Sequence, residues 1–376
     1  MTPTKGFELR SCVTGAGELE LSLEEVELPP LGAGEVLVRV EAAPINPSDL
    51  ILLLGPADPS AIRVGGTEDR PRLTAPLPPK SLRALQARLD QSMPVGNEGA
   101  GVVVAAGAGA EALMGKKVAL VVGGMYAQYR LARASDCLVL NDDASPQDGA
   151  SAFVNPLTAL GMVETMRNEG HTALVHTAAA SNLGQMLNRV CLADNIPLVN
   201  IVRSPEQANL LKAQGANHVL DSSAPDFREH LVAAIAETGA TLGFDAIGGG
   251  TLASQILSAM EVAANRRGGE YSRYGSSVFK QVYIYGVLDE SPTIVNRNFG
   301  LTWGMGGWLL GVFLAKAGPD VGKRLRDRVV AELKTTFASH YTAEISLADA
   351  LDPVVLQAYA RRATGEKYLI APHRAP

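Results

Sequence analysis

The sequence predicts an α/β protein that combines a doubly wound parallel sheet with a separate β-rich domain. From about residue 156 onward, short apolar runs alternate with segments of helical spacing, as in a parallel sheet covered on both faces. Before residue 155, apolar and polar residues alternate as in half-buried strands. A length of 376 residues also suits two domains.

Composition and charge exclude several classes of protein. The chain is 47% apolar, and its net charge of −6 argues against a general binder of nucleic acid or of membrane surfaces. Its three cysteines, Cys12, Cys137 and Cys191, form no C-x-x-C pair, which fits a reducing cytoplasm. The apolar stretch Phe299–Ala315 is shorter than a membrane span, and we interpret it as a buried or interface helix. We therefore expect a cytoplasmic protein without nucleic-acid or membrane partners.

The β-rich domain begins with clear strand patterns. Gly34–Ala42 alternates apolar and polar residues, and Pro44–Asp49 follows as a loop that two prolines keep extended and that Asn46 can stabilise through its side chain. Residues 56–92 contain six prolines and several charges, so we interpret them as an inserted excursion. Such an excursion is either a lid or partner arm, or a disordered surface loop.

The central unit of the predicted parallel sheet is His171–Ser204. An apolar run, Ala173–His176, leads into a turn of small residues, Thr177–Asn182, then into a helix and a second apolar run, Pro197–Val202. A turn of this kind presents backbone N–H groups and the positive end of a helix, which suits a pyrophosphate. Of the usual glycines only Gly184 is present, so an ordinary crossover without a ligand is an equal alternative.

The end of the second strand of this unit favours one dinucleotide over the other. An NAD site normally has Asp or Glu at this point for the ribose 2′-hydroxyl, whereas this chain has Arg203 followed by Ser204. A guanidinium and a hydroxyl suit a 2′-phosphate, so the prediction is NADPH rather than NADH. The alternative is that Arg203 is a solvated surface charge.

Later strands of the sheet bring further residues to the same edge. Leu242–Ile247 precedes three glycines, and Val282–Val287 is a second apolar run. Because ligands bind at the carboxyl ends of parallel strands, Ala246–Gly248 and Tyr285–Val287 should lie beside the turn and Arg203. The chain should end with a helix near Val321–Thr336 and a final strand that returns to the first domain.

Several short motifs occur in a characteristic order along nearly the whole chain: INPSDL, PVGNEGAGVV, GKKVAL, GGMYAQYRLA, NPLTAL, FDAIGG and TGEKYLIAP. In this order they resemble the medium-chain dehydrogenase/reductase superfamily, and within it the zinc-free quinone oxidoreductase and enoyl reductase branches. The resemblance implies a discontinuous GroES-like β-rich domain, residues 1–155 and 298–376, and a Rossmann dinucleotide-binding domain, residues 156–297.

The resemblance also carries expectations about metals. Zinc-dependent members have a histidine where this chain has Asn97, and a cysteine in the region of Asn46. The six histidines form no motif with the spacing of zinc ligands, so we expect no metal.

The site residues that the resemblance implies fall into four groups. Asn46 and Thr158 would approach the nicotinamide, and Arg203 and Ser204 would bind the 2′-phosphate. The pyrophosphate would be held by Ala180, Ser181, Asn182, Leu183 and Gly184, and the nicotinamide ribose would be flanked by Ile247, Tyr285, Gly286 and Val287. Lys367 is a further candidate for a phosphate contact.

The leading functional hypothesis is an NADPH-dependent reductase of a quinone or a conjugated enone. NADPH supplies hydride and the protein positions it, with Asn46 and Tyr126 as the candidate catalytic residues. Tyr126 could donate a proton, although an aromatic residue on a strand more often serves packing. A second hypothesis is an enoyl-thioester reductase with another proton donor, because Ala57 occupies the position of the usual tyrosine. A third is a nucleotide-binding protein without catalysis, which the missing turn glycines suggest.

The resemblance further implies a homodimer formed by joining Rossmann sheets edge to edge. Val278–Val287 is then the expected edge strand, and Arg266–Ser277 reads as an insertion that serves as an interface arm or a substrate loop.

Overall fold

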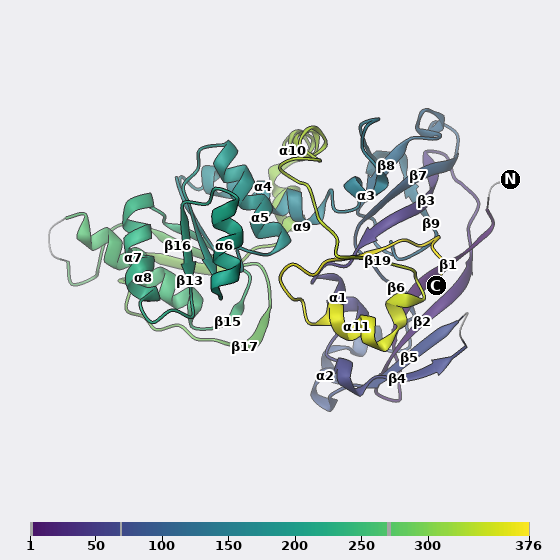
Figure 1. Ribbon diagram of the computed structural model, residues 1–376, viewed down its shortest axis with the longest axis horizontal. Helices are drawn as coiled ribbons and strands as arrows, with labels where there is room; N and C mark the ends of the chain where they lie inside the picture. The colour runs from purple at the N-terminus through teal and green to yellow at the C-terminus, as the bar shows by residue number, and fades with distance from the viewer. Residues whose placement is uncertain (1–2, 68–69, 269–271, 376) are drawn as a thin grey trace. The chain divides into compact units, whose positions relative to one another are not determined.

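The computed structural model describes residues 3–67, 70–268 and 272–375, so residues 68–69 and 269–271 of the two expected insertions lie outside it. It forms two compact units, residues 1–154 with 329–376, and residues 155–328 (Figure 1). The expected second boundary at residue 298 is wrong, because residues 298–328 pack within the second unit. Within the described ranges, no helix has the length and apolar character needed to cross a membrane.

The first unit contains two sheets. One has the strand order β4-β5-β2-β1-β6, and the other has the order β10-β8-β7-β3-β20-β19, with β9 paired to β3. The strands are β1 (Lys5–Val13), β2 (Glu18–Glu27), β3 (Glu35–Pro44), β4 (Arg63–Gly66), β5 (Pro71–Pro76), β6 (Met93–Pro94), β7 (Gly99–Ala106), β8 (Lys117–Leu120), β9 (Tyr129–Arg133), β10 (Leu138–Val139), β19 (Ala343–Ile345) and β20 (Tyr368–Ile370). Its short helices are α1 (Asp49–Leu53), α2 (Pro79–Ala84), α3 (Pro146–Gly149) and α11 (Pro353–Ala360), with 3₁₀ turns at Pro59–Ala61, Gln86–Arg88, Glu111–Leu113, Ala134–Asp136 and Asp349–Leu351.

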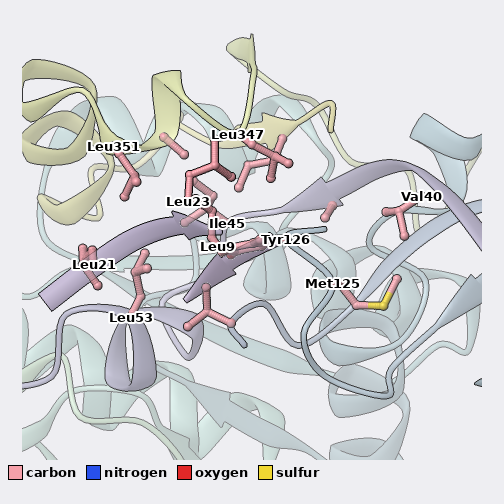
Figure 2. Packing of buried hydrophobic residues seen from close by; sticks show 14 of the residues in the cluster. Leu9, Leu21, Leu23, Val40, Ile45, Leu53, Met125, Tyr126, Leu347 and Leu351 are labelled. Carbon is pink, nitrogen blue, oxygen red and sulfur yellow. The ribbon is translucent and has the colours of Figure 1, made fainter. Parts of the chain in front are cut away.

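Alternating apolar side chains form the core of this unit. Leu9 on β1 lies opposite Leu23 on β2, and both contribute to a buried cluster with Ile45 and Tyr126 (Figure 2). Each residue of a strand points to the face opposite its neighbour, so the regular spacing places these side chains on one buried face.

Residues 56–92 are part of this fold, which corrects the expected excursion. β4 and β5 form a hairpin whose second strand pairs with β2, with Leu73 opposite Leu21. Leu73, Ala75 and Leu77 are buried in the main core of the unit. The prolines of this segment lie mostly at the ends of its elements, where no ladder hydrogen bond is lost.

The second unit is built on a six-stranded parallel sheet of order β13-β12-β11-β14-β16-β18. Its strands are β11 (Leu174–His176), β12 (Leu198–Val202), β13 (His218–Asp221), β14 (Leu242–Asp245), β16 (Lys280–Ile284) and β18 (Trp303–Gly307); β15 (Gly248–Gly250) and β17 (Asp289–Thr293) form a small separate pair. Numbered by their sequence, the six strands follow the order 3-2-1-4-5-6 of the Rossmann fold, which confirms the predicted fold class.

Helices cover both faces of this sheet. α7 and α8 pack on the face that carries Val199 and Ile201, whereas α5 and α6 cover the opposite face, which carries Asn200 and Val202. The helices of the unit are α4 (Val154–Asn168), α5 (Asn182–Ala193), α6 (Pro205–Ala213), α7 (Phe227–Thr238), α8 (Leu252–Arg266), α9 (Leu310–Ala317) and α10 (Pro319–Ala331), and the unit boundaries fall inside α4 and α10.

The stretch Phe299–Ala315 is not the single helix that the sequence suggests. Its middle forms β18, which extends the sheet beyond β16, and only the residues from Leu310 onward are helical. The expected edge strand, Val278–Val287, therefore lies inside the sheet as β16, and β18 is its edge. Ion pairs from Arg324 to Glu164 and from Arg328 to Asp194 hold α10 against the same unit.

Candidate functional site

The turn between β11 and α5 has the form of a dinucleotide loop in spite of its alanines. Ala178 has a positive φ of 50°, the region that glycine usually supplies, and Ser181 caps α5 by accepting a hydrogen bond from Gly184 N at 3.1 Å. A Cβ at Gly184 would lie 2.2 Å from the carbonyl oxygen of Ala179. Gly184 is therefore the glycine that lets the helix approach the strand closely.

This turn leaves hydrogen-bond donors free. The backbone N–H groups of Ala180 and Leu183 have no acceptor among the described residues. Because the first N–H groups of a helix lack intrahelical partners and carry partial positive charge, they can bind a phosphate oxygen. The expected residues Ala180–Gly184 thus form one structural unit at the end of β11.

Arg203 lies at the end of the neighbouring strand β12. Its guanidinium is exposed and makes no ion pair with any residue that the structure describes. The Ser204 hydroxyl caps α6, accepting from Gln207 N at 3.4 Å, and its hydrogen bond to Glu206 lowers the pKa of that carboxyl. A 2′-phosphate here would gain attraction from Arg203 and meet repulsion from Glu206.

Two residues that the sequence analysis did not select organise the end of β14. The Thr177 hydroxyl donates to Asp245 Oδ1 at 2.7 Å and accepts from Ala246 N at 2.8 Å. The buried carboxylate of Asp245 also accepts from Ile247 N at 3.0 Å and from Gly248 N at 3.2 Å. These bonds set the backbone of the expected ribose-contacting segment, and the aspartate in the FDAIGG motif was the available signal.

His176 and Tyr285 form a polar pair on the same edge. His176 Nε2 and the Tyr285 hydroxyl are 2.7 Å apart, and the rings stack with centroids 5.8 Å apart. Burial lowers the pKa of His176 to about 3 and raises that of Tyr285, so both stay neutral at pH 7.

Tyr285, Gly286 and Val287 also line a largely apolar pocket whose other lining residues are Ile284, Gly307, Trp308, Leu309 and Val312. Thr158 lies buried on α4.

In the first unit, two buried carboxylates hold the Asn46 loop. Asp49 accepts from Asn46 N at 2.7 Å and from Asn97 N at 2.8 Å, while Glu98 accepts from Asn46 Nδ2 at 2.8 Å. Glu98 also accepts from the backbone N–H groups of Phe153 and Val154, each at 2.9 Å. Burial raises the pKa of Glu98 and that of Asp49, the latter to about 7. Asn46 Oδ1 is buried without a partner in the described chain, so this amide keeps an acceptor for a ligand.

Tyr126 is buried next to Asp49, the carboxylate that accepts from Asn46 N. Its ring is completely buried in the core, beside Leu9 and Ile45 in Figure 2, and its hydroxyl donates to Pro44 O at 3.1 Å. Burial raises its pKa well above the usual value. The structure therefore packs the Tyr126 ring in the core of the first unit.

Lys367, immediately before β20, ends in a short chain of hydroxyl groups. Its Nζ donates to Ser151 Oγ at 2.9 Å, and Ser151 Oγ lies 2.9 Å from the Tyr341 hydroxyl. Lys367 Nζ also lies 5.6 Å from the centre of the Tyr341 ring. Burial lowers the pKa of Lys367 to about 8, and the negative charge of Glu98 opposes that shift. Spacing in the sequence could not have brought residues 151, 341 and 367 together.

The described residues contain no group of three or more His, Cys, Asp or Glu side chains that could hold a metal ion. Asn97 and Asn46, at the positions expected for zinc ligands in zinc-dependent members, make hydrogen bonds instead. The amide of Asn97 donates to Ser48 Oγ at 3.1 Å, and that of Asn46 donates to Glu98.

Comparison with known proteins agrees with this architecture. Residues 32–142 match the model of the alcohol dehydrogenase GroES-like domain. The mitochondrial enoyl-[acyl-carrier-protein] reductase of Arabidopsis thaliana is 27% identical over 273 residues, which cover 69% of this chain and 63% of that protein. The enzyme of the same name from Bos taurus is 27% identical over 210 residues, which cover 53% of this chain and 48% of that protein. The chain thus spans about half to two thirds of the length of these relatives. A crystal structure from Mesorhizobium loti, provisionally designated an NADPH:quinone reductase, is 26% identical with a TM-score of 0.73 over 99% of this chain and 100% of that one. In its GroES-like domain and its Rossmann-type sheet, the chain is similar to these reductases.

Proposed function

We propose that this protein is an NADPH-dependent oxidoreductase that transfers hydride to a quinone or a conjugated enone. The observation that carries the proposal is the carboxyl edge of the parallel sheet. There a capped helix start with free N–H groups at Ala180 and Leu183 lies one strand away from the unpaired guanidinium of Arg203. The similarity to the Mesorhizobium loti protein supports the same reading.

The residues present fit a dinucleotide. The free N–H groups of the turn suit a pyrophosphate, Arg203 suits a 2′-phosphate, and the ordered Ile247–Gly248 backbone with Gly286 and Val287 suits the nicotinamide ribose. When bound, NADPH supplies the hydride. Asn46, with its free buried acceptor, and Thr158 are proposed to bind the nicotinamide, and Ser181, Asn182 and Ser204 to support the phosphate contacts through the helix caps.

An enoyl-thioester reductase is the second candidate, because the curated relatives named above carry that designation. The position of the usual tyrosine donor is Ala57, which is buried in the core of the first unit. Steady-state kinetics separate the candidates. A quinone or enone reductase should show kcat/KM at least about tenfold higher for 1,4-benzoquinone or cyclohexenone than for crotonyl-CoA, and a thioester reductase the reverse.

The proposal includes three further properties: catalysis without zinc, a cytoplasmic location and a homodimer. β18 supports the last of these, since among the described strands it pairs only with β16 and so leaves one edge open. The expected native mass is twice 39.5 kDa, measured by light scattering, and kcat should not change after dialysis against a chelator.

Calorimetric titration with NADPH and NADH tests the cofactor assignment. NADPH should bind at least about tenfold more tightly than NADH, and Arg203→Ala should remove most of that preference, as expected for loss of a charge-assisted phosphate contact. Arg228→Ala, which removes an exposed arginine from α7 of the same unit, is the matched control and should change neither affinity. Glu206→Gln should strengthen NADPH binding because it removes the repelling charge.

The outcomes separate the parts of the proposal. Equal affinity for NADH and NADPH would remove Arg203 from its role and leave the reductase in place. Binding of neither dinucleotide would mean that the alanine-rich turn no longer holds a pyrophosphate, and the protein would then be a relative of these reductases without this chemistry.

A further inference from the structure

Three buried polar side chains of the second unit lie together on the α5 face of the parallel sheet. His176 on β11 and Asn200 on β12 are register neighbours, and both residues are completely buried. Asn200 Nδ2 donates to Oδ1 of Asn188, a buried residue of α5, at 3.3 Å. Among the described residues, His176 Nδ1, Asn200 Oδ1 and Asn188 Nδ2 have no hydrogen-bond partner. The three unpaired atoms thus belong to one cluster between α5 and the sheet.

The orientation of the imidazole places its unpaired nitrogen on the side of Asn200. β11 lies between β12 and β14 in the sheet, and β16 follows β14. His176 Nε2 is 2.7 Å from the hydroxyl of Tyr285, which directly follows β16. Because the hydrogen-bond directions of the two ring nitrogens diverge widely, a ring that contacts Tyr285 through Nε2 directs Nδ1 away from Tyr285, toward the β12 side of the sheet.

Leaving these atoms unpaired would destabilise the fold, because a buried polar atom without a partner loses its hydration and gains no bond in return. In folded proteins the large majority of such atoms are paired with protein or with ordered water. Turning the amides does not solve the problem. If the oxygen and nitrogen of both asparagines are exchanged, one amide oxygen and one amide N–H remain unpaired, as before. The cluster therefore needs a further group that both donates and accepts.

One water molecule matches the unpaired atoms. His176 Nδ1 and Asn200 Oδ1 can each accept a hydrogen bond, and Asn188 Nδ2 can donate one, so a water that donates twice and accepts once pairs all three. A buried water usually makes about three hydrogen bonds. An ion suits the cluster less well, because its members are two amides and an imidazole that burial keeps neutral at pH 7, with a pKa of about 3.

The same count of donors and acceptors determines the tautomer of His176. If Nδ1 carried the hydrogen, the water would accept from Nδ1 and from an asparagine, and one of its own two hydrogens would remain unpaired in the interior. With Nδ1 as an acceptor, both hydrogens of the water are used. The neutral ring then carries its hydrogen on Nε2, which donates to the hydroxyl oxygen of Tyr285.

Tyr285 is the end of this chain at the carboxyl edge of the sheet. Its hydroxyl has no other partner among the described residues. The residue is half-buried and lines the apolar pocket at the ends of β16 and β18. Since the hydroxyl oxygen accepts from His176 Nε2, the hydroxyl hydrogen is left for an acceptor outside the cluster.

We propose that the second unit holds a buried water molecule between His176, Asn188 and Asn200, and that this water selects the imidazole tautomer that makes the Tyr285 hydroxyl a hydrogen-bond donor at the sheet edge. The water and the tautomer are independent of the proposed function. The identity of the acceptor, an oxygen of the bound dinucleotide, rests on the proposed function.

Two measurements without cofactor test the buried site. A high-resolution crystal structure should show a water within about 2.7–3.2 Å of His176 Nδ1 and of both asparagines. In protein with isotope-labelled histidine, the ring nitrogens of His176, assigned by their absence from His176→Gln, should show the hydrogen on Nε2. The double variant Asn188→Leu with Asn200→Leu replaces both amides by apolar side chains of similar size, and its crystal structure should lack the water.

Calorimetry tests the donor role of Tyr285. Tyr285→Phe should weaken NADPH binding by about three- to tenfold, as expected for the loss of one hydrogen bond between neutral groups. Tyr283→Phe is the matched control. It removes a hydroxyl from the same strand that donates to Glu169 Oε1 at 2.8 Å, and it should leave the affinity for NADPH unchanged.

Each result decides a part of the proposal. A cluster without water, in which the side chains pair with one another, would overturn the site, and a hydrogen on Nδ1 would overturn the tautomer. Equal NADPH affinity of the wild type and Tyr285→Phe, or an equal loss in Tyr283→Phe, would overturn the donor role. If the wild type binds neither NADPH nor NADH, the proposed function fails and the donor role fails with it, while the two measurements without cofactor still decide the water and the tautomer.

Discussion

Gly184 and Ala179 are in direct contact across the turn between β11 and α5: a Cβ added to Gly184 would lie 2.2 Å from the carbonyl oxygen of Ala179. A separation this short cannot be relieved by rotating a side chain, because the neighbour is backbone. The helix start and the strand end must therefore move apart if any larger residue occupies position 184. This contact explains why the single surviving glycine of the turn stands where it does.

Gly184→Ala should destabilise the second unit by about 1–3 kcal/mol, the usual penalty of overpacking, and should abolish measurable NADPH binding. Both tryptophans, Trp303 and Trp308, lie in that unit, so their fluorescence during urea unfolding reports on it. Gly311→Ala on α9, where a Cβ meets nothing within 4 Å, is the control and should leave stability unchanged or raise it by up to about 1 kcal/mol. Equal effects of the two substitutions would contradict the packing argument.

Ala178→Gly should raise the free energy of unfolding of the second unit slightly, by up to about 1 kcal/mol. Ala178 has a φ of 50°, and relief of the left-handed strain exceeds the entropic penalty of glycine by a small margin. Ala179→Gly, at a buried neighbour without a positive φ, should instead be destabilising. The same fluorescence measurement checks both, and a destabilised Ala178→Gly variant would argue against strain at this position.

His176 should make the free energy of unfolding decrease at acid pH. Its pKa is about 3 in the folded protein and near 6.5 when unfolded, so its favourable neutral state is present above pH 6.5 and is lost as the pH falls toward 3. His176→Gln keeps a partner for the Tyr285 hydroxyl but does not titrate. The stability of the wild type relative to this variant should therefore fall below pH 6.5, by at most about 1.4 kcal/mol per pH unit. A constant difference between pH 7 and pH 4 would exclude this role.

Replacing Glu98 by glutamine should destabilise the protein far less than replacing it by alanine. Glu98→Gln can still accept from Phe153 N and Val154 N, and Asn46 can turn its unused oxygen toward the new amide. Glu98→Ala removes the acceptor of three donors, which we expect to cost about 3 kcal/mol or more. Thermal unfolding followed by circular dichroism compares the two variants, and similar losses in both would show that the charge matters more than the hydrogen bonds.

The sequence predicted those parts of the fold that local patterns determine. The strand–turn–helix at 173–193 and the alternation of strands and helices after it are present, because apolar spacing decides both. The prediction of a single helix for residues 299–315 was wrong, because glycines between apolar residues give the same pattern in a buried helix and in an edge strand. The interpretation of residues 56–92 as an inserted excursion was wrong for a related reason. Prolines and charges suggest a loop, and the hairpin is regular only through its pairing with β2.

The candidate site was predictable to the extent that it follows the sheet edge. Turn residues and Arg203 lie at strand ends, which the topology rule places together. The partners that orient them do not follow from such a rule. Asp245 holds Thr177, and Lys367 reaches Ser151 across 216 positions of sequence, through tertiary contacts that no spacing encodes.

The discontinuity of the first unit has a consequence for how the protein is made. β20 pairs with β3, yet more than three hundred residues separate the two strands, and the whole second unit is synthesised between them. The second unit is therefore completely synthesised while the first unit still lacks β19 and β20. Since domains fold as units during synthesis, the second unit should mature first and the first unit should remain a client of chaperones until its last strand emerges.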